Sequence, residues 1–381
     1  MRKLSPPRSA IRRSRRKRTA AAVTIKEVAR RAGVSVATVS RVVNDSAPVR
    51  EETRRRIGHA IRRLRYVPHG AAKSLITRKT HTLAVLLPDL YGEFFSELIR
   101  GIDLAARKDG YHLLVSGSHG SPAEMEAMLR AIRGRVDGLI ALAPDLPARA
   151  FDENLPPGFP VVLLNGGGRR GASSSIRVDN YGGARSMVRH LMRLGHRAIT
   201  FVTGPPSNHD AAERRRGFRD AIRRKPATTA REVPGDFREE AGYRAASRIL
   251  KARPLSTAVF AANDAMAIGV LCAFRERGIQ VPEEIAVVGF DDIPTSRFIT
   301  PALTTVRVPI AELGNRATAR LLHALRGSGG SPGQPEILRT TLVVRTSCGC
   351  PRGERPRGPY PSQRGLNTYP EATPTMRHPE F

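Results

Sequence analysis

The chain has 381 residues, of which 40% are hydrophobic and 5% aromatic, so it is long enough for two or three compact units. Its formal net charge of +30 favours an anionic partner, without distinguishing DNA from RNA or an acidic membrane. Residues 1–80 hold 23 of the 64 basic side chains but only 4 of the 34 acidic ones, so most of the positive field lies in the first fifth of the chain.

No apolar run approaches the ~18 residues of a membrane span, and the apolar stretch 20–23 is too short for a signal peptide. We therefore expect a cytoplasmic protein. The three cysteines, Cys272, Cys348 and Cys350, include no zinc-type C-x-x-C pair. We interpret them as incidental thiols of a reducing compartment, with a redox role as the alternative, and we expect no metal and no cofactor.

Residues 1–22 are rich in Arg, Ser and Pro and show no apolar period, which predicts a disordered basic arm. Two interpretations stay open for this arm. It is either a solvated tail that includes an over-extended start, or a segment that contacts nucleic-acid phosphates without specificity.

Residues 23–68 predict a small all-α unit. Thr24 with Glu27 three residues later is a capping box at the start of a first helix. The stretch 32–35 breaks that helix, and Ser35 can cap a second one. A third helix follows, with apolar residues at helical spacing: Ile57, Ala60, Ile61 and Leu64. Two helices joined by a tight glycine-containing turn form a helix-turn-helix motif.

The second helix has the two faces that a DNA recognition helix needs. Its buried stripe consists of Val39, Val42 and Val43. Its other face carries small and polar side chains: Ala37, Thr38, Ser40 and Arg41. Small side chains near the helix start let the backbone approach base edges closely. Arg41, one turn further, can bind the O6 and N7 atoms of a guanine, a contact worth about 1–3 kcal/mol of discrimination.

Residues 24–80 resemble the headpiece of the LacI/GalR family of transcription regulators, and 23–44 match its helix-turn-helix almost without gaps. By this resemblance, Val36, Ala37 and Arg41 read bases. The resemblance also implies phosphate contacts from five polar residues: Thr24, Ser35, Ser40, Asn44 and Thr53. Because one helix-turn-helix reads only half a site, we expect a homodimer, or a tetramer, on a near-palindromic double-stranded DNA operator.

Pro68 ends the bundle, and residues 69–80 form a polar, basic connector. In the family, this connector becomes a hinge helix when two subunits meet on DNA, and its leucine wedges into the minor groove. Leu75 matches that leucine and Ala72 its small neighbour, whereas His69 departs from the usual Asn. A plain linker with an incidental leucine is the alternative. Ordering a helix costs roughly 1–2 kcal/mol per residue, so separating paired hinges would weaken DNA binding.

From residue 81 to 350, strands alternate with helices in two runs, which predicts an α/β core of two doubly wound parallel-sheet lobes. Strands are expected at 83–87, 113–116, 138–142, 161–164, 198–203, 257–261 and 285–290. Helices are expected at 94–108, 123–133, 182–194, 211–224, 239–251 and 264–277. We expect lobe one to hold 82–178 plus 308–335 and lobe two 179–307 plus 336–350. Residues 351–381 predict a disordered tail.

This core resembles the family's effector domain, whose fold is that of periplasmic sugar-binding proteins. The best-matched segments are 194–197, 214–218, 262–269, 288–293 and 301–305. The resemblance places the effector contacts at six residues, two of them on the first-lobe side: Phe94, Phe95, Arg214, Phe237, Asn263 and Asp291. The loop 166–171 departs from the family's shorter one, and either lines the mouth of the cleft or is a flexible insert.

Ligands of parallel α/β sheets bind beyond the carboxyl ends of the strands. Asp89, Asn263 and Asp291 each follow a predicted strand, and we expect Arg214 to open the helix after the strand 201–203, so these groups should face one cleft. They suit vicinal hydroxyls or a carboxylate. A sugar or sugar derivative is our first expectation for the effector, and a sugar phosphate or nucleobase would also fit. Salt bridges, strand-end caps and core packing are the alternatives for the single residues.

Three other functions fit less well. The core alone would suit the solute-binding protein of a transporter, but the headpiece and the missing signal peptide argue against it. An enzyme is disfavoured because no nucleophile–base set, phosphate-binding loop or H-E-x-x-H pair is present. A sequence-blind nucleic-acid protein would ignore operator sequence. We therefore predict an effector-controlled transcription repressor, with an activator as the alternative, that associates with the nucleoid when bound to DNA. Whether the effector releases DNA or promotes its capture stays open.

Overall fold

The structure is a computed structural model that describes residues 23–44, 47–67, 79–142, 148–165, 173–223, 228–327 and 336–349. The chain divides into two compact units, Met1–Thr80 and His81–Phe381. The predicted basic arm, the hinge residues Ala72 and Leu75, the loop 166–171 and the tail 351–381 lie outside the described residues.

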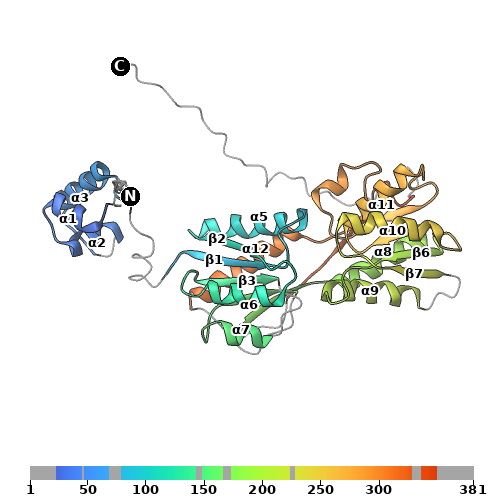
Figure 1. Cartoon of the computed structure of the whole chain (residues 1–381), viewed down its shortest axis with the longest axis horizontal. Helices are drawn as coiled ribbons and strands as arrows, with labels where there is room; N and C mark the ends of the chain where they lie inside the picture. Colours follow the sequence, from blue (N-terminus) through green and yellow to red (C-terminus); the bar gives the residue numbers. More distant parts are fainter. Residues whose placement is uncertain are drawn as a thin grey trace, which may run out of the picture. The chain divides into compact units, whose positions relative to one another are not determined.

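The first unit is a bundle of the three predicted helices (Figure 1): α1 (Ile25–Ala32), α2 (Val36–Asn44) and α3 (Glu51–Leu64). One side chain from each helix is fully buried at its centre, namely Val28, Val39 and Ile57. The helical periods seen in the sequence therefore meet in one small core.

The turn between α1 and α2 depends on Gly33. This residue has a left-handed φ of 64°, and its N–H donates to the carbonyl oxygens of Ala29 and Arg30. Nη2 of Arg56 on α3 donates to the carbonyl oxygen of Ala32 at 2.5 Å. The glycine thus ends α1, and the arginine fixes the turn against the third helix.

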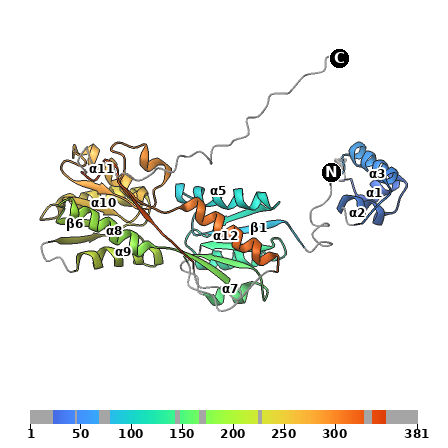
Figure 2. The same cartoon turned by 180° about the vertical axis from the view of Figure 1, so that it is seen from behind.

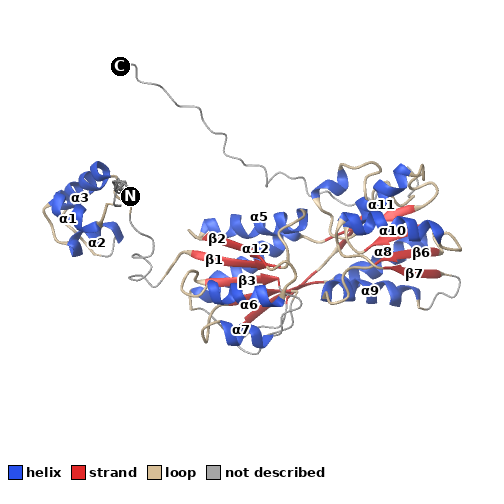
Figure 3. Cartoon of the chain, in the orientation of Figure 1, coloured by secondary structure: helices blue, strands red, loops and turns tan. Residues whose placement is uncertain are grey.

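The second unit holds two lobes, and each lobe is a parallel sheet with helices on both faces (Figures 1 and 3). The first sheet has the order β11-β5-β4-β3-β1-β2. Its strands are β1 (Thr82–Leu87), β2 (His112–Gly117), β3 (Gly138–Leu142), β4 (Val161–Leu164), β5 (Ser173–Val178) and β11 (Glu336–Leu338). One face packs against α5 (Glu93–Lys108) and α12 (Ile310–Leu325), the other against α6 (Pro122–Ala131) and α7 (Ala148–Asn154).

The second sheet has the order β7-β6-β8-β9. Its strands are β6 (Ala198–Val202), β7 (Thr229–Val233), β8 (Ala258–Ala261) and β9 (Ala286–Val288). Helices α8 (Asn180–Arg193) and α9 (His209–Ile222) pair on one face, and α10 (Glu239–Lys251) and α11 (Asp264–Glu276) on the other. A short 3-10 helix, η1 (Pro294–Arg297), follows β9. This architecture confirms the predicted fold class.

Within the described ranges, three segments join the lobes (Figure 2). One leads from β5 into α8, and the others include the antiparallel strands β10 (Thr305–Arg307) and β12 (Thr341–Val343). The expectation that 336–350 belongs wholly to lobe two is wrong for β11, because this strand pairs in parallel with β5 at the edge of the first sheet. The last crossing therefore begins after Leu338 and includes β12.

Candidate functional site

Helix α2 displays the residues predicted to read bases. Val36 is 41% exposed, and Ala37 and Arg41 are also exposed, whereas Val39 is fully buried in the bundle. Ser35 caps the helix as predicted, because its Oγ accepts the Thr38 N–H at 3.1 Å. The helix therefore has one apolar face on the bundle and one solvent-facing side that carries an arginine.

The residues predicted to contact phosphates are partly engaged in local hydrogen bonds. The N–H and the hydroxyl of Thr24 donate to Oε2 of Glu27 at 2.7 and 3.1 Å, which forms the carboxylate half of the predicted capping box. Nδ2 of Asn44 donates to Oγ of Ser40 at 3.2 Å. Thr53 is half-buried in the first turn of α3. Phosphate contacts by these residues stay predictions.

Arg214 is the centre of the predicted effector site, and it is only 5% exposed. It lies in the second turn of α9 and not at the start of a helix as expected, because α9 begins at His209. Its Nη1 donates to the carbonyl oxygen of Ala262 at 2.6 Å, and its guanidinium carbon lies 3.9 Å from the ring centroid of Phe290. The cation is thus held beside the carboxyl end of β8.

Asp291 supplies the charge opposite this arginine. Its Oδ1 lies 2.9 Å from Nη2 of Arg214, yet forms no well-aligned hydrogen bond with any residue that the structure describes. Burial raises the pKa of Asp291 to about 6, although Arg214 acts to lower it. The backbone φ of 110° at Asp291 is strained for a residue with a side chain. Because a carboxylate oxygen accepts more than one hydrogen bond, Oδ1 of Asp291 is suited to a further donor from a ligand.

Phe237 and Asn263 lie beside the same arginine. The ring centroid of Phe237 is 5.7 Å from the guanidinium carbon of Arg214. Asn263 is the N-cap of α11, since its Oδ1 accepts the Met266 N–H at 3.0 Å, and its Nδ2 donates to the carbonyl oxygen of Phe237 at 2.8 Å. The structure therefore brings the predicted second-lobe residues together, with Asn263 also acting as a helix cap.

Asp89 belongs to the first lobe and contacts the second. Its Oδ1 accepts the N–H groups of Leu90 and Tyr91 at 2.7 and 3.1 Å. Its Oδ2 forms an ion pair with Nη2 of Arg238 in the second lobe at 2.9 Å. Both carboxylate oxygens are thus engaged by the protein itself, and an effector contact by Asp89 stays a prediction.

Phe94 and Phe95 are half-buried at the start of α5, with their rings edge to face and the centroids 5.5 Å apart. The neighbouring Glu93 accepts the N–H of Thr295 on its Oε2 at 2.9 Å. Because Thr295 follows Asp291 by four residues, this contact places the start of α5 near the loop that carries Asp291. Effector contacts by Phe94 and Phe95 stay predictions.

A chain of polar side chains that sequence reasoning did not single out links Arg214 to the first lobe. Nε of Arg214 donates to Oδ1 of Asn180 at 2.8 Å, and Nδ2 of Asn180 donates to Oδ1 of Asp210 at 2.9 Å. The other oxygen of Asp210 accepts from Nδ2 of Asn165, in the first lobe, at 2.8 Å. Burial raises the pKa of Asp210, and Arg214 opposes this rise. Asn165 directly follows a predicted strand, so the strand-end rule was the signal available for it.

Further carboxylates support the loop that carries Asp291. Oδ2 of Asp264, which is fully buried, accepts the N–H of Ile293 at 2.9 Å, and its Oδ1 accepts the hydroxyl of Thr305 at 2.5 Å. Burial raises the pKa of Asp264 well above its ordinary value. Asp292 binds two arginines at 2.5 and 2.6 Å. Burial acts to raise the pKa of Asp292, but these arginines hold it below its ordinary value.

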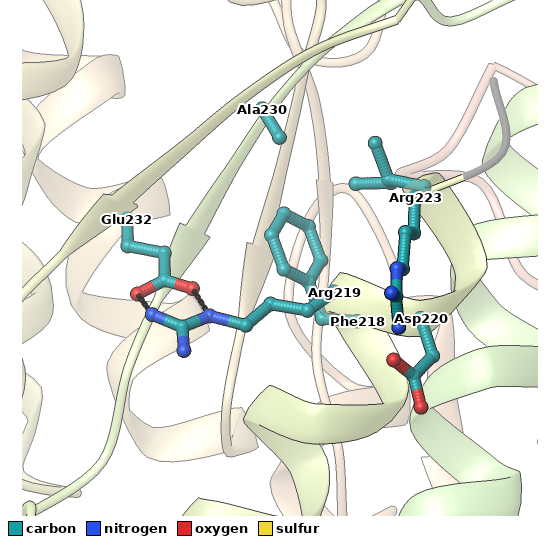
Figure 4. Close-up of a pocket in the computed structure, with 7 residues that line it drawn as sticks. Phe218, Arg219, Asp220, Arg223, Ala230 and Glu232 are labelled. Atoms are coloured by element: carbon teal, nitrogen blue, oxygen red, sulfur yellow. Dashed lines mark hydrogen bonds and ion pairs between the residues drawn. The ribbon is translucent and has the colours of Figure 1, made fainter. Parts of the chain in front are cut away.

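Two neighbouring hollows of about 520 and 590 Å³ lie at the β7 side of the second lobe. Figure 4 shows the first of them, where Nε and Nη2 of Arg219 on α9 bind the two carboxylate oxygens of Glu232 on β7 at 2.6 and 2.9 Å. Neither hollow is lined by Arg214, Asn263 or Asp291. The hollows are therefore separate from the predicted effector residues.

The described part of the chain offers neither a membrane-spanning helix nor a metal-binding cluster. No helix there is both long and apolar enough to cross a bilayer. The same residues contain no group of three or more His, Cys, Asp or Glu side chains arranged to hold a metal ion. Of the cysteines, Cys272 and Cys348 are free thiols, and Cys348 is buried.

Comparison with known proteins matches both units of the chain. Residues 24–69 match the bacterial regulatory proteins of the lacI family, and residues 188–348 match the periplasmic binding protein-like domain. The HTH-type transcriptional repressor PurR of Proteus mirabilis is 36% identical over 309 residues, which cover 79% of this chain and 90% of that protein.

Solved structures give the same result. The lac repressor dimer bound to operator and the anti-inducer ONPF has a TM-score of 0.77 and 30% identity, and the match covers 86% of this chain and 99% of that one. A LacI family transcriptional regulator from Enterococcus faecium with bound ribose has a TM-score of 0.63 and 30% identity, covering 70% of this chain and 98% of that one.

The helix-turn-helix headpiece, the two-lobed core with its buried polar centre and these relatives define a DNA-binding transcriptional repressor with a small-molecule effector domain. More particularly, the chain belongs to the LacI family of bacterial regulators. The predictions of this family and of a regulator that is not an enzyme are confirmed.

Proposed function

We propose that this repressor binds a near-palindromic operator as a homodimer, and that a sugar or sugar derivative bound between the lobes of the core controls that binding. The observation that carries the effector assignment is the buried pair of Arg214 and Asp291, whose carboxylate oxygen Oδ1 lacks a well-aligned hydrogen bond within the described residues. A hydroxyl of the effector supplies the missing donor, in a site where water is largely excluded.

The surroundings of this pair fit a sugar ring. A pyranose or furanose offers hydroxyls to Asp291 and Arg214 and an apolar face to an aromatic ring such as Phe237. The ribose found in the Enterococcus faecium regulator supports this class of ligand. Asn263 and the first-lobe rings of Phe94 and Phe95 complete the proposed site, and Asp89 lies at its rim.

A nucleobase is the second candidate for the effector. Phenylalanines from both lobes, Phe94 and Phe95 on one side and Phe237 on the other, are able to stack on the faces of a planar heterocycle. A base would use its ring N–H, in place of a hydroxyl, as the donor to Asp291. The two candidates therefore differ in which contact dominates, stacking for a base and hydroxyl hydrogen bonds for a sugar.

On the DNA, the exposed side of α2 enters the major groove, where Val36, Ala37 and Arg41 read bases. The proposed phosphate contacts come from Thr24, Ser35, Ser40, Asn44 and Thr53. Ala72 and Leu75 of the hinge, which lie outside the described residues, are proposed to enter the minor groove. The lac repressor dimer bound to operator supports this arrangement.

A second copy of the chain is the proposed partner in dimer formation. Leu104 on α5 and Leu114 on β2 are 50% and 41% exposed, and these two elements pack against each other at the edge of the first sheet. Large apolar side chains exposed on adjacent elements are typical of subunit interfaces. We propose that this dimer acts in the cytoplasm, where its operator DNA lies.

Selection of genomic fragments by the purified protein tests the DNA-binding proposal. We expect enrichment of one near-palindromic sequence, and a mobility shift by two chains per site that survives excess scrambled competitor. Equal binding to the selected and scrambled duplexes would contradict base readout, and a single chain that binds a half-site at full affinity would contradict the dimer.

A thermal-shift screen of carbohydrates and nucleobases tests the effector proposal, because a ligand that binds the native state raises the melting temperature by mass action. We expect Asp291→Ala and Arg214→Ala to keep operator binding and lose the response to the ligand that is found. Arg219→Ala is the matched control, since this arginine lies on the same helix but binds Glu232 at the sheet edge. A normal response in both site variants would place the effector elsewhere.

A further inference from the structure

Two of the contacts between the lobes lie side by side, where the loop after β1 meets the start of α10. Oδ2 of Asp89 in the first lobe lies 2.9 Å from Nη2 of Arg238 in the second lobe. Beside this pair, the hydroxyl of Tyr91, two residues after Asp89, donates to Oε2 of Glu239, the residue after Arg238, at 3.4 Å. The first lobe therefore presents an acid and a phenol to a complementary arginine and glutamate of the second lobe.

Local hydrogen bonds fix the direction of the Asp89 carboxylate. Its Oδ1 accepts the N–H groups of Leu90 and Tyr91, which leaves Oδ2 for the arginine. Burial acts to raise the pKa of Asp89, but these bonds and Arg238 hold it below its ordinary value, so the group is ionised at neutral pH. On the other side, the N–H of Arg238 donates to Oδ1 of Asp236 at 2.9 Å, which orders the start of α10. Both partners are thus positioned by their own lobes.

We propose that Asp89 and Arg238 form a cross-lobe latch that holds the lobes closed before any effector binds and that salt concentration weakens. The side chains of Asp89 and Arg238 are 26% and 60% exposed, so the pair stands in water and is screened by ions. Exposed ion pairs shift an equilibrium by about two- to five-fold. The latch therefore adjusts a lobe equilibrium that other contacts also support.

This role differs from that of a ligand-binding aspartate. Asp89 acts as a positioning residue, because both of its carboxylate oxygens are engaged by the protein and its ion pair sets the fraction of molecules whose lobes are closed. When only the closed form binds the effector, the apparent affinity is proportional to the closed fraction, so a smaller closed fraction lowers the affinity. The latch thus sets effector affinity from outside the group of Arg214 and Asp291.

The N–H of Thr295 reports lobe closure independently of the latch. Its acceptor is Oε2 of Glu93, which lies in the first lobe, whereas Thr295 belongs to η1 in the second. When the lobes separate, this N–H loses its acceptor and exchanges with solvent. Its exchange rate is therefore proportional to the population of the open form.

Hydrogen exchange of the full-length protein, without effector and at about 50 mM salt, tests the latch by mass spectrometry of peptides that cover Thr295. The variants are Asp89→Asn, which retains Oδ1 for the local turn, Arg238→Gln and the double variant. Arg244→Gln is the matched control, because Arg244 also lies in α10 but pairs at 3.5 Å with Asp236 of its own lobe.

We expect each single change to speed exchange at Thr295 by about two- to five-fold, the double change to add nothing further, and the control to match the wild type. Raising salt to about 500 mM should bring the wild type to the rate of the variants. The latch proposal would be overturned by unchanged exchange in the single variants or by fully additive effects in the double variant. An equal effect of Arg244→Gln would also overturn it. Because no effector is added, these outcomes do not depend on the proposed ligand.

Discussion

Removal of the Arg214 guanidinium should destabilise the core more at pH 7.5 than at pH 5. The side chains of Arg214 and Asp291 are 6% and 7% exposed, with Nη2 and Oδ1 2.9 Å apart. Breaking such a buried pair by removing one partner costs about 3–5 kcal/mol, because the remaining charge is left without compensation. We expect a loss of this size for Arg214→Met at pH 7.5, measured as the free energy of unfolding.

The pH dependence follows from the pKa of Asp291, which burial raises to about 6 in the folded chain. The pKa of an aspartate in the unfolded chain is near 3.9. Ionisation of Asp291 therefore lowers the free energy of unfolding by about 3 kcal/mol above pH 6. Below about pH 4 the carboxyl is protonated in both states, and this cost is absent. Below pH 6, Asp291 is protonated and Arg214 has little charge to neutralise. The cost of Arg214→Met therefore grows by at most about 1.4 kcal/mol per pH unit above 6, or about 2 kcal/mol by pH 7.5.

Urea unfolding followed by far-ultraviolet circular dichroism at both pH values measures this difference. The double variant Arg214→Met/Asp291→Asn should lose the pH dependence, since the titrating carboxyl is gone. Arg219→Met is the control, because its partner Glu232 is bound at the exposed sheet edge. A destabilisation by Arg214→Met that is equal at both pH values would refute the reasoning. So would a double variant that keeps the pH dependence, because the titrating group would then be another one, such as Asp210.

Three other predictions concern DNA binding and assembly. Arg41→Ala should lower affinity for the selected operator by about 1–3 kcal/mol and spare binding to scrambled DNA, as fluorescence anisotropy would show; an equal loss on both would argue against a base contact. Ile57→Ala should cost about 2–5 kcal/mol and melt the headpiece, so calorimetry should show the core transition alone; a shifted core transition would contradict two independent units. Leu104→Arg should shift sedimentation from dimer to monomer, and an intact dimer would place the interface elsewhere.

The headpiece could be predicted almost completely because its signals are local. The Glu27 carboxylate, Gly33 at the helix end and Ser35 at the next helix start are all encoded within a few residues of the turn they shape. The strands of the two lobes were predicted where buried apolar runs mark them. Strand β5 was missed because Ser173–Val178 starts with three serines. Strand β11 was missed because it has only three residues, one of them the exposed Ile337, and its strand partner β5 is distant along the chain.

The effector site was predictable in its residue types but not in its connections. The strand-end rule and the resemblance selected Arg214, Asn263 and Asp291, which the structure brings together. Partners that are distant along the chain could not be inferred, such as Asp89 with Arg238, 149 residues apart, or Asn165 with Asp210, 45 residues apart. These pairs depend on how the two sheets are positioned relative to each other, and the periodicity of the sequence carries no information about that position.

Strand β7 ends the second sheet, so one of its sides has no neighbouring strand among the residues that the structure describes. Exposed edges of this kind are where chains add to one another and aggregate. Arg215 and Arg219 of α9 both form ion pairs with Glu232 on this strand, which places charged groups at the edge. Charge at this edge disfavours the addition of a strand from another copy of the chain.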